Sequence, residues 1–274
     1  MTSQIATEHY QKKVERAHPG LIVMLLDDSG SMASSLAGGS DTRYEWVERY
    51  SGIILKELLA RSTEVSGESH SIKARYYLDV IKYGSRVECW SDEEVDIGEA
   101  VKRFAGASGS FGLGGNLSGT DAASAFQTAL TRLQSALVKD RFKNSFPPIV
   151  FHLTDGESAT DAEPYAQQIM NLSSNDGNVL IVNAYIGTST ALNYQGPNDF
   201  PGYLTEQEIG SNPDSLRMFQ MSSVIPNSIR QNLIDDGIFP VIRENARLFF
   251  DVRTKEMLKH VIQVVGSGGS RLRH

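Results

Sequence analysis

The stretch LIVMLLDDSGSM, residues 21–32, decides the fold of this chain. Residues 21–26 are apolar at every position, and the polar residues Asp27-Asp28-Ser29-Gly30 follow directly. A strand that is apolar on both faces is buried on both sides, which is typical of a central strand in a parallel sheet. The run is far shorter than the roughly 20 apolar residues that cross a bilayer. We therefore predict a buried central strand whose carboxyl end carries polar side chains.

Similar patterns recur along the rest of the chain. Three further apolar runs predict strands, at residues 149–153, 179–186 and 247–252. Apolar residues at helical spacing predict helices at 44–59, 121–138, 162–172 and 255–265. Two strand-like runs within residues 74–90 flank Tyr83-Gly84-Ser85, which predicts a hairpin. Because strands alternate with helices, we predict an α/β fold: a doubly wound, mostly parallel sheet with one antiparallel edge strand and helices on both faces.

The composition indicates one domain, at residues 21–265, between a polar segment at 1–20 and a flexible tail at 266–274. Residues 188–215, which are rich in turn-forming residues, predict an insertion after a central strand. Residues 108–119 (SGSFGLGGNLSG) predict a mobile loop.

Charge and cysteine content exclude several classes of protein. The net charge is −7, which disfavours a general electrostatic grip on nucleic acid or anionic membranes. The single cysteine excludes an internal disulfide framework. The first 20 residues lack the apolar run of a signal peptide, so we expect a cytoplasmic protein, and we expect a monomer.

Three polar clusters follow predicted strands or open a predicted helix. The first is Asp27-x-Ser29-x-Ser31, the second is Thr120 in Gly119-Thr120-Asp121, and the third is Asp155 after the strand at 149–153. In an open parallel sheet, ligands bind where strands reach their carboxyl edge. Two carboxylates and three hydroxyls are hard oxygen donors, which suit Mg²⁺ or Mn²⁺. The sequence therefore predicts a divalent-metal site at this edge.

These clusters resemble the von Willebrand factor A (vWA) domain. Its metal-ion-dependent adhesion site is written D-x-S-x-S, then T, then D, and this chain fills every position in that order over about residues 21–265. The resemblance implies that Ser29 and Ser31 would bind the metal directly and Thr120 directly or through water. Asp27 and Asp155 would then hold the metal's waters.

The resemblance also implies a function without catalysis. Neutral hydroxyls leave the ion's charge poorly neutralised, so a Glu or Asp from a partner protein would complete the coordination sphere. The chain is similar to stand-alone bacterial vWA proteins of tellurite-resistance-type clusters, which implies a scaffold or adaptor in stress response, defence or phospho-signalling. A protein kinase or a PP2C-like phosphatase is then the expected partner. The alternative is a vWA adaptor of a MoxR-type AAA+ ATPase.

The same residues also allow structural roles, and two classes of enzyme can be compared with the sequence. Ser29 and Thr120 are also common helix caps, and we expect Asp28 to be a solvated or capping acid. His152 lies in a strand, where we expect it to be packed in the core. A Mg²⁺-dependent phosphatase of the haloacid-dehalogenase type needs a second Asp two residues after the first, where this chain has Ser29. No G-x-S-x-G elbow of a serine hydrolase is present either, so we expect no enzymatic activity.

Overall fold

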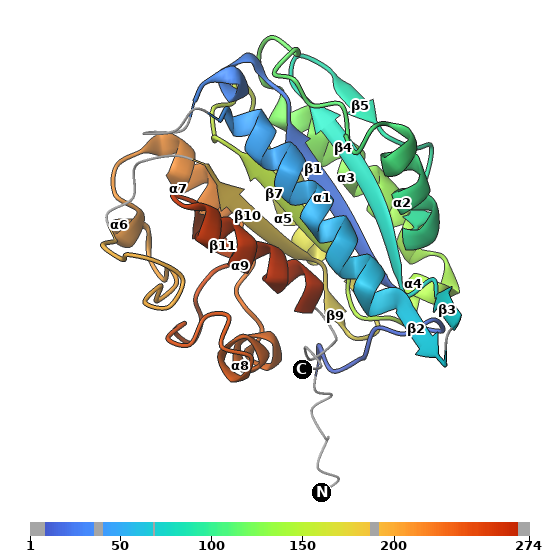
Figure 1. Ribbon diagram of the computed structural model, residues 1–274. Helices are drawn as coiled ribbons and strands as arrows, with labels where there is room; N and C mark the ends of the chain where they lie inside the picture. Colours follow the sequence, from blue (N-terminus) through green and yellow to red (C-terminus); the bar gives the residue numbers. More distant parts are fainter. Residues whose placement is uncertain (1–8, 36–40, 68, 187–191, 268–274) are drawn as a thin grey trace, which may run out of the picture.

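The computed structural model describes residues 9–35, 41–67, 69–186 and 192–267. These residues form a seven-stranded sheet in the order β11-β10-β7-β1-β4-β5, with β6 also paired to β4 (Figure 1). The strands are β1 (Gly20–Asp27), β4 (Tyr76–Tyr83), β5 (Val87–Cys89), β6 (Val95–Asp96), β7 (Ile149–Thr154), β10 (Leu180–Tyr185) and β11 (Phe249–Asp251). The apolar run at residues 21–26 is thus an inner strand, between β7 and β4.

The sheet is mixed, and its parallel part is the larger one. β1 pairs in parallel with β4 and β7, and β10 pairs in parallel with β7 and β11. β5 and β6 are short and run antiparallel to β4 at the other edge. All eight residues of β1 are buried, as expected for a strand covered on both faces. The predicted fold class, with its antiparallel edge, is confirmed.

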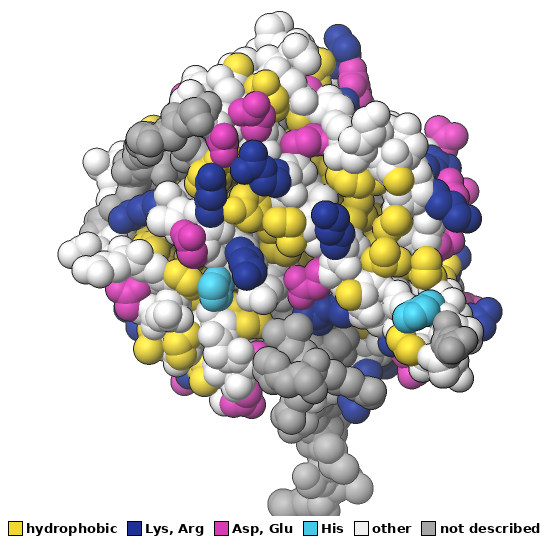
Figure 2. Space-filling view, in the orientation of Figure 1, with side chains coloured by type: hydrophobic (Ala, Val, Ile, Leu, Met, Phe, Trp, Pro, Cys, Tyr) yellow, Lys and Arg dark blue, Asp and Glu magenta, His cyan; other side chains and the backbone are white. Residues whose placement is uncertain are grey.

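Helices cover both faces of the sheet (Figure 1). α1 (Arg43–Ser62) packs against α2 (Ile97–Gly106) and α9 (Lys255–Ser267) on one face. α3 (Ala122–Leu137) packs against α4 (Asp140–Lys143) and α5 (Glu163–Asn171) on the other. The apolar stripes that predicted α1 and α3 are their buried faces, including Val47 and Ile54 of α1 and Phe126 and Leu133 of α3. The face that α1 and α9 form has basic and acidic side chains interspersed with apolar ones (Figure 2).

Smaller elements complete the described chain. They are the 3-10 helix η1 (Gly30–Ala33), the hairpins β2 (Thr63–Ser66)–β3 (Ser69–Ile72) and β8 (Ser173–Ser174)–β9 (Gly177–Asn178), and the helices α6 (Glu206–Ile209), α7 (Pro213–Gln220) and α8 (Asn227–Asp235). Within the described ranges, no helix combines the length and the apolar character needed to cross a membrane.

The expected flanking segments lie partly outside the described residues. Residues 1–8, 187–191 and 268–274 fall there, and with them most of the predicted tail. The tail was predicted from residue 266, whereas α9 extends to Ser267. The described part of the polar N-terminal segment is joined to the turn between β8 and β9, because Tyr10 donates its amide to the carbonyl of Asp176 at 2.6 Å. The predicted insertion contains α6 and the beginning of α7.

Candidate metal centre

The first element of the site is Asp27, the last residue of β1. Its carboxylate is buried and accepts the amide of Ser29 at 2.9 Å and the hydroxyl of Thr154 at 2.5 Å. Burial raises the pKa of Asp27 to about 6; the two hydrogen-bonding neighbours act against that shift, and the negative charge of Asp155 adds to it. The negative charge of Asp155 is therefore close enough to act on Asp27.

The second element is a pair of hydroxyls. The Oγ atoms of Ser29 and Ser31 lie 3.1 Å apart, which places them side by side just after the carboxyl end of β1. Ser29 is buried and Ser31 is half-buried. The chain turns into η1 at this point, so that residues two apart present their hydroxyls together. The D-x-S-x-S spacing thus brings one carboxylate and two hydroxyls to one corner of the sheet.

The third element is Asp155, which directly follows β7, the strand beside β1. It is buried, and its Oδ2 lies 2.5 Å from Nη1 of Arg43 at the beginning of α1. Its Oδ1 accepts the amide of Glu157 at 3.4 Å. The carboxylate predicted for the metal therefore already has a cationic partner within the protein, and sequence reasoning missed that partner.

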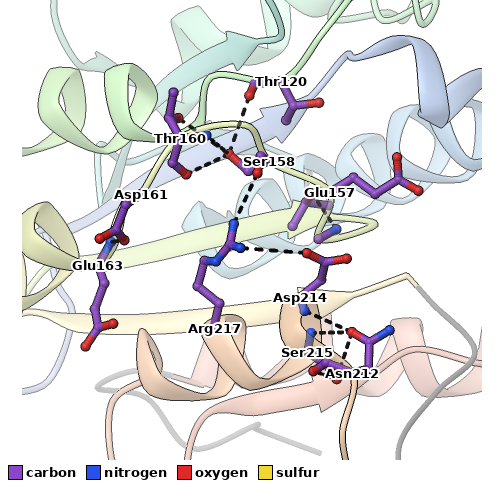
Figure 3. A network of polar contacts seen from close by, with 12 residues as sticks. Thr120, Glu157, Ser158, Thr160, Asp161, Glu163, Asn212, Asp214, Ser215 and Arg217 are labelled. Atoms are coloured by element: carbon purple, nitrogen blue, oxygen red, sulfur yellow. Dashed lines mark hydrogen bonds and ion pairs between the residues drawn. The ribbon is translucent and has the colours of Figure 1, made fainter.

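Thr120 lies on the loop before α3, and its backbone carbonyl, not its side chain, is hydrogen-bonded to the loop after β7. Its carbonyl oxygen accepts the amide of Ala159 at 3.1 Å and the hydroxyl of Ser158 at 3.4 Å, which ties it to the loop after β7 (Figure 3). The residue that caps α3 is Asp121, whose side chain accepts the amide of Ser124 at 3.1 Å. The half-buried Thr120 is thus not the cap of this helix. The structure brings Asp27, Ser29, Ser31 and Asp155 together and places Thr120 on the adjoining loop.

The Gly-rich loop at 108–119 is fastened at two points. Oδ1 of Asp28 accepts the amides of Gly114 and Gly115, each at 2.7 Å. The carboxylate of Glu48, on α1, accepts the amide of Leu113 at 3.2 Å and also that of Phe111. The sequence predicted that this loop is mobile. In the structure, two carboxylates accept its amides, and several of its side chains are buried in the core.

Asp28 is therefore not the solvated or helix-capping acid that the sequence led us to expect. Only 2% of the residue is exposed, and its partners belong to a loop more than eighty residues away. The expectation was wrong because no local pattern reveals a tertiary acceptor of this kind.

An acidic residue that no sequence pattern points to, Asp214, borders the site from α7. The Cβ of Asp214 lies 3.0 Å from the position that a Cβ would take at Gly156, which has a φ of +87°. Burial raises the pKa of Asp214, the charge of Arg217 lowers it, and the negative charge of Asp155 raises it. Arg217 donates to the carbonyl of Ser158 at 3.2 Å and lies 4.0 Å from Asp214 (Figure 3). Asp214 therefore lies within electrostatic reach of Asp155.

A buried polar chain crosses the sheet behind these loops. His152 of β7 lies 2.6 Å from the hydroxyl of Tyr83 and 2.8 Å from Oδ1 of Asn183. Asn183 donates in turn to Oγ of Ser222 at 2.9 Å. Burial lowers the pKa of His152 to about 4, so the ring is neutral at pH 7. Its expected place in the core is confirmed, and both of its ring nitrogens are engaged.

The donor set fits a hard divalent cation. Two buried carboxylates and adjacent hydroxyls offer oxygen ligands alone, which suits Mg²⁺ or Mn²⁺. Among the residues that the structure describes, no group of three or more His, Cys, Asp or Glu side chains is placed to hold a metal. A site here would therefore depend on the serine and threonine hydroxyls as well as on Asp27 and Asp155.

Comparison with known proteins supports the fold. No protein-family model matches this chain, and no curated protein matches it. Proximal thread matrix protein 1 from the mussel byssus is similar over 93% of this chain and 48% of its own, with 11% identity and a TM-score of 0.51. Its form with a zinc-occupied MIDAS motif has 12% identity, the same coverage and a TM-score of 0.50.

A von Willebrand factor type A protein from Catenulispora acidiphila is similar over 62% of this chain and 33% of its own, with 15% identity and a TM-score of 0.43. Of the two proteins, the mussel one is about twice as long as the part that this chain matches, because the match covers 48% of it. Likeness at such low identity concerns the fold alone. Together with the strand order, the likeness to the mussel protein, whose zinc-bound form carries a MIDAS motif, supports a Rossmann-like fold of the vWA type.

Proposed function

We propose that this chain is a protein-interaction module that binds an acidic side chain of a partner through a divalent metal ion. Asp27, Ser29, Ser31, Thr120 and Asp155 would hold the ion. The proposal rests above all on one observation: two buried carboxylates and a pair of hydroxyls meet where β1 and β7 end. When bound, the ion supplies positive charge at the edge of the sheet, which attracts a carboxylate.

The protein's own residues prepare the site for this role. The amide of Ser29 and the hydroxyl of Thr154 fix the orientation of Asp27. Thr120 is positioned by its carbonyl, which leaves its hydroxyl available as a ligand. The mussel protein carries zinc in its MIDAS motif, which supports a divalent metal here and makes zinc a necessary arm of any test.

We further propose that the module does not catalyse a reaction. The imidazole that lies nearest in sequence to Asp155, that of His152, is buried and hydrogen-bonded at both nitrogens, so it is not a free general base. The second alternative, a Mg²⁺-dependent phosphatase, would require an acid in the place of Ser29. Steady hydrolysis of a phosphoester by the wild type, lost in Asp27→Asn, would favour that alternative.

Two kinds of partner are proposed, both from the sequence resemblance. The first is a cytoplasmic stress-response or defence system of the tellurite-resistance type, with a protein kinase or PP2C-like phosphatase as partner. The second is a MoxR-type AAA+ ATPase. Both would use the same metal-bridged contact, so the identity of the captured protein separates them.

Titration calorimetry with Mg²⁺, Mn²⁺ and Zn²⁺ tests the metal site directly. We expect the wild type to bind one ion and Ser29→Ala and Asp27→Asn to bind it more weakly. Ser34→Ala is the matched control, because Ser34 is exposed at the end of the same 3-10 helix. Equal affinity in Ser29→Ala, Asp27→Asn and the control would refute the assignment.

A capture experiment tests the interaction. Immobilised protein is exposed to native lysate with Mg²⁺ or with EDTA, and bound proteins are identified by mass spectrometry. We expect one partner whose retention requires both the metal and Asp27. Replacing the partner's bridging Glu or Asp by the amide should abolish that retention. A partner that binds equally well in EDTA and to Asp27→Asn would contradict a metal-bridged contact.

A further inference from the structure

Arg43 presents a positive charge to the same carboxylate that the metal would use. Its Nη1 lies 2.5 Å from Oδ2 of Asp155, whose side chain is only 2% exposed. The Arg43 side chain is itself mostly buried, with 22% of its surface exposed. Its Nε is buried and has no hydrogen-bond partner among the described residues. A guanidinium is therefore held against Asp155 although its own hydrogen-bonding capacity is only partly used.

The backbone of Arg43 is hydrogen-bonded to the segment that follows Ser29 and Ser31. The amide of Arg43 donates to the carbonyl of Ser34 at 3.0 Å, and Ser35 forms an isolated antiparallel bridge with Thr42. Thr42 caps α1 in a capping box with Glu45. The first turn of α1 is thus joined to the end of η1, which carries Ser31. A change in the partner of Asp155 would therefore act on both segments.

We propose that Arg43 is a built-in counter-cation that competes with the metal ion for Asp155. This inference rests on the proposed metal-binding function. Without a metal, the guanidinium neutralises a buried carboxylate whose charge would otherwise be costly to bury. To bind a metal with the full charge of Asp155, the protein must loosen this ion pair. Arg43 therefore stabilises the metal-free protein and lowers its affinity for divalent ions.

The charge of Arg43 distinguishes this effect from a merely structural contact. An arginine keeps its charge at every pH that the folded protein tolerates, so the competition is permanent. Arg43→Gln removes the charge while keeping a polar side chain, and Arg43→Lys keeps the charge without the planar fork. Arg49→Gln is the matched control: Arg49 is on the same helix, its side chain is 53% exposed, and it pairs with Asp41 at 3.2 Å instead.

The first measurement is calorimetric titration of the full chain with Mn²⁺. We expect Arg43→Gln to bind Mn²⁺ on the order of tenfold more tightly than the wild type, which is a typical coupling between two linked sites. Arg43→Lys should stay close to the wild type, and Arg49→Gln should be indistinguishable from it. Affinity in Arg43→Gln that is equal to or weaker than that of the wild type would overturn the inference while leaving the metal site intact.

Thermal unfolding provides the second measurement. In EDTA, Arg43→Gln should unfold at a lower temperature than Arg49→Gln, because Asp155 loses its counter-cation. Saturating Mn²⁺ should narrow or reverse that difference, since the metal now binds the freed carboxylate. If neither the wild type nor Arg43→Gln binds Mn²⁺, the proposed function itself fails along with this inference. A difference between the variants that Mn²⁺ does not change would assign Arg43 a structural role only and overturn the competition.

Discussion

Replacing His152 by Leu should destabilise the protein strongly, although the substitution puts an apolar residue into an apolar strand. His152 is 1% exposed and lies 2.6 Å from the Tyr83 hydroxyl and 2.8 Å from Oδ1 of Asn183. The change removes the imidazole from both of these buried groups, at up to about 1–3 kcal/mol each, and Tyr83 keeps its contact with Thr154. We therefore expect the free energy of unfolding at pH 7 to fall by about 2–6 kcal/mol, measured by urea denaturation followed by circular dichroism.

The pH dependence offers an independent check of the same reasoning. The pKa of His152 is lowered from 6.5 to about 4, so the folded protein binds fewer protons than the unfolded chain between these values. Its contribution to stability is therefore full above pH 6.5 and is lost as the pH falls through 4, in total about 3 kcal/mol. Burial raises the pKa of Asp79 to about 6, which has the opposite effect.

The difference between the wild type and His152→Leu isolates the histidine from Asp79 and other groups. That difference should shrink as the pH falls from 7 to 4. A second control is Tyr83→Phe, which removes one of the two partners. In its background, His152→Leu should cost less than it does in the wild type. A cost below about 1 kcal/mol at pH 7, or a cost that does not change with pH, would refute this account of the buried chain.

Three further substitutions test the loops around the candidate site. Asp28→Ala removes the acceptor of two loop amides, so hydrogen exchange of residues 114–115 should accelerate and stability should fall by about 2 kcal/mol, whereas the exposed Asp92→Ala should change neither. Gly84→Ala would place a Cβ 2.2 Å from that of Leu117, so proteolysis within residues 108–119 should become faster. Thr120→Ala should keep its melting temperature in EDTA but lose about ten- to hundredfold in metal-dependent partner affinity, measured by surface plasmon resonance.

The sheet could be predicted from the sequence because its signals are local. Each apolar run shows a strand that both layers of helices cover. The observed bounds of β1, β7 and β10 lie within one residue of the predicted ones at both ends. The sequence also carries a local signal for α2, which the strand and helix patterns above do not include. Asp96 caps it by accepting the amides of Gly98 and Glu99, and Ile97 and Ala100 form its buried face.

The sequence could predict those residues of the candidate site that lie at the ends of strands. Asp27 ends one strand, Ser29 and Ser31 follow it, and Asp155 follows the neighbouring strand, so the edge rule for parallel sheets brings them together. Arg43 lies 112 residues from Asp155, in a helix that covers the sheet, and no spacing links the two. Asp214 similarly reaches the site from a segment that the sequence presented as an insertion. Contacts of this kind depend on how the layers pack, which periodicity does not encode.

The charges that packing adds explain why an acidic partner would need the metal. Asp27, Asp155 and Asp214 border the site together with Arg43 and Arg217, and the buried Asp28 lies next to Asp27, so carboxylates outnumber guanidiniums at this corner. A carboxylate approaching this corner is repelled when no metal is bound. A divalent ion would offset this negative charge and place a positive charge at the point of contact, within a partly buried site where screening by salt is weak. In the proposed site, the five signature positions would supply the donors, while the surrounding residues would make attraction of an acidic side chain conditional on the ion.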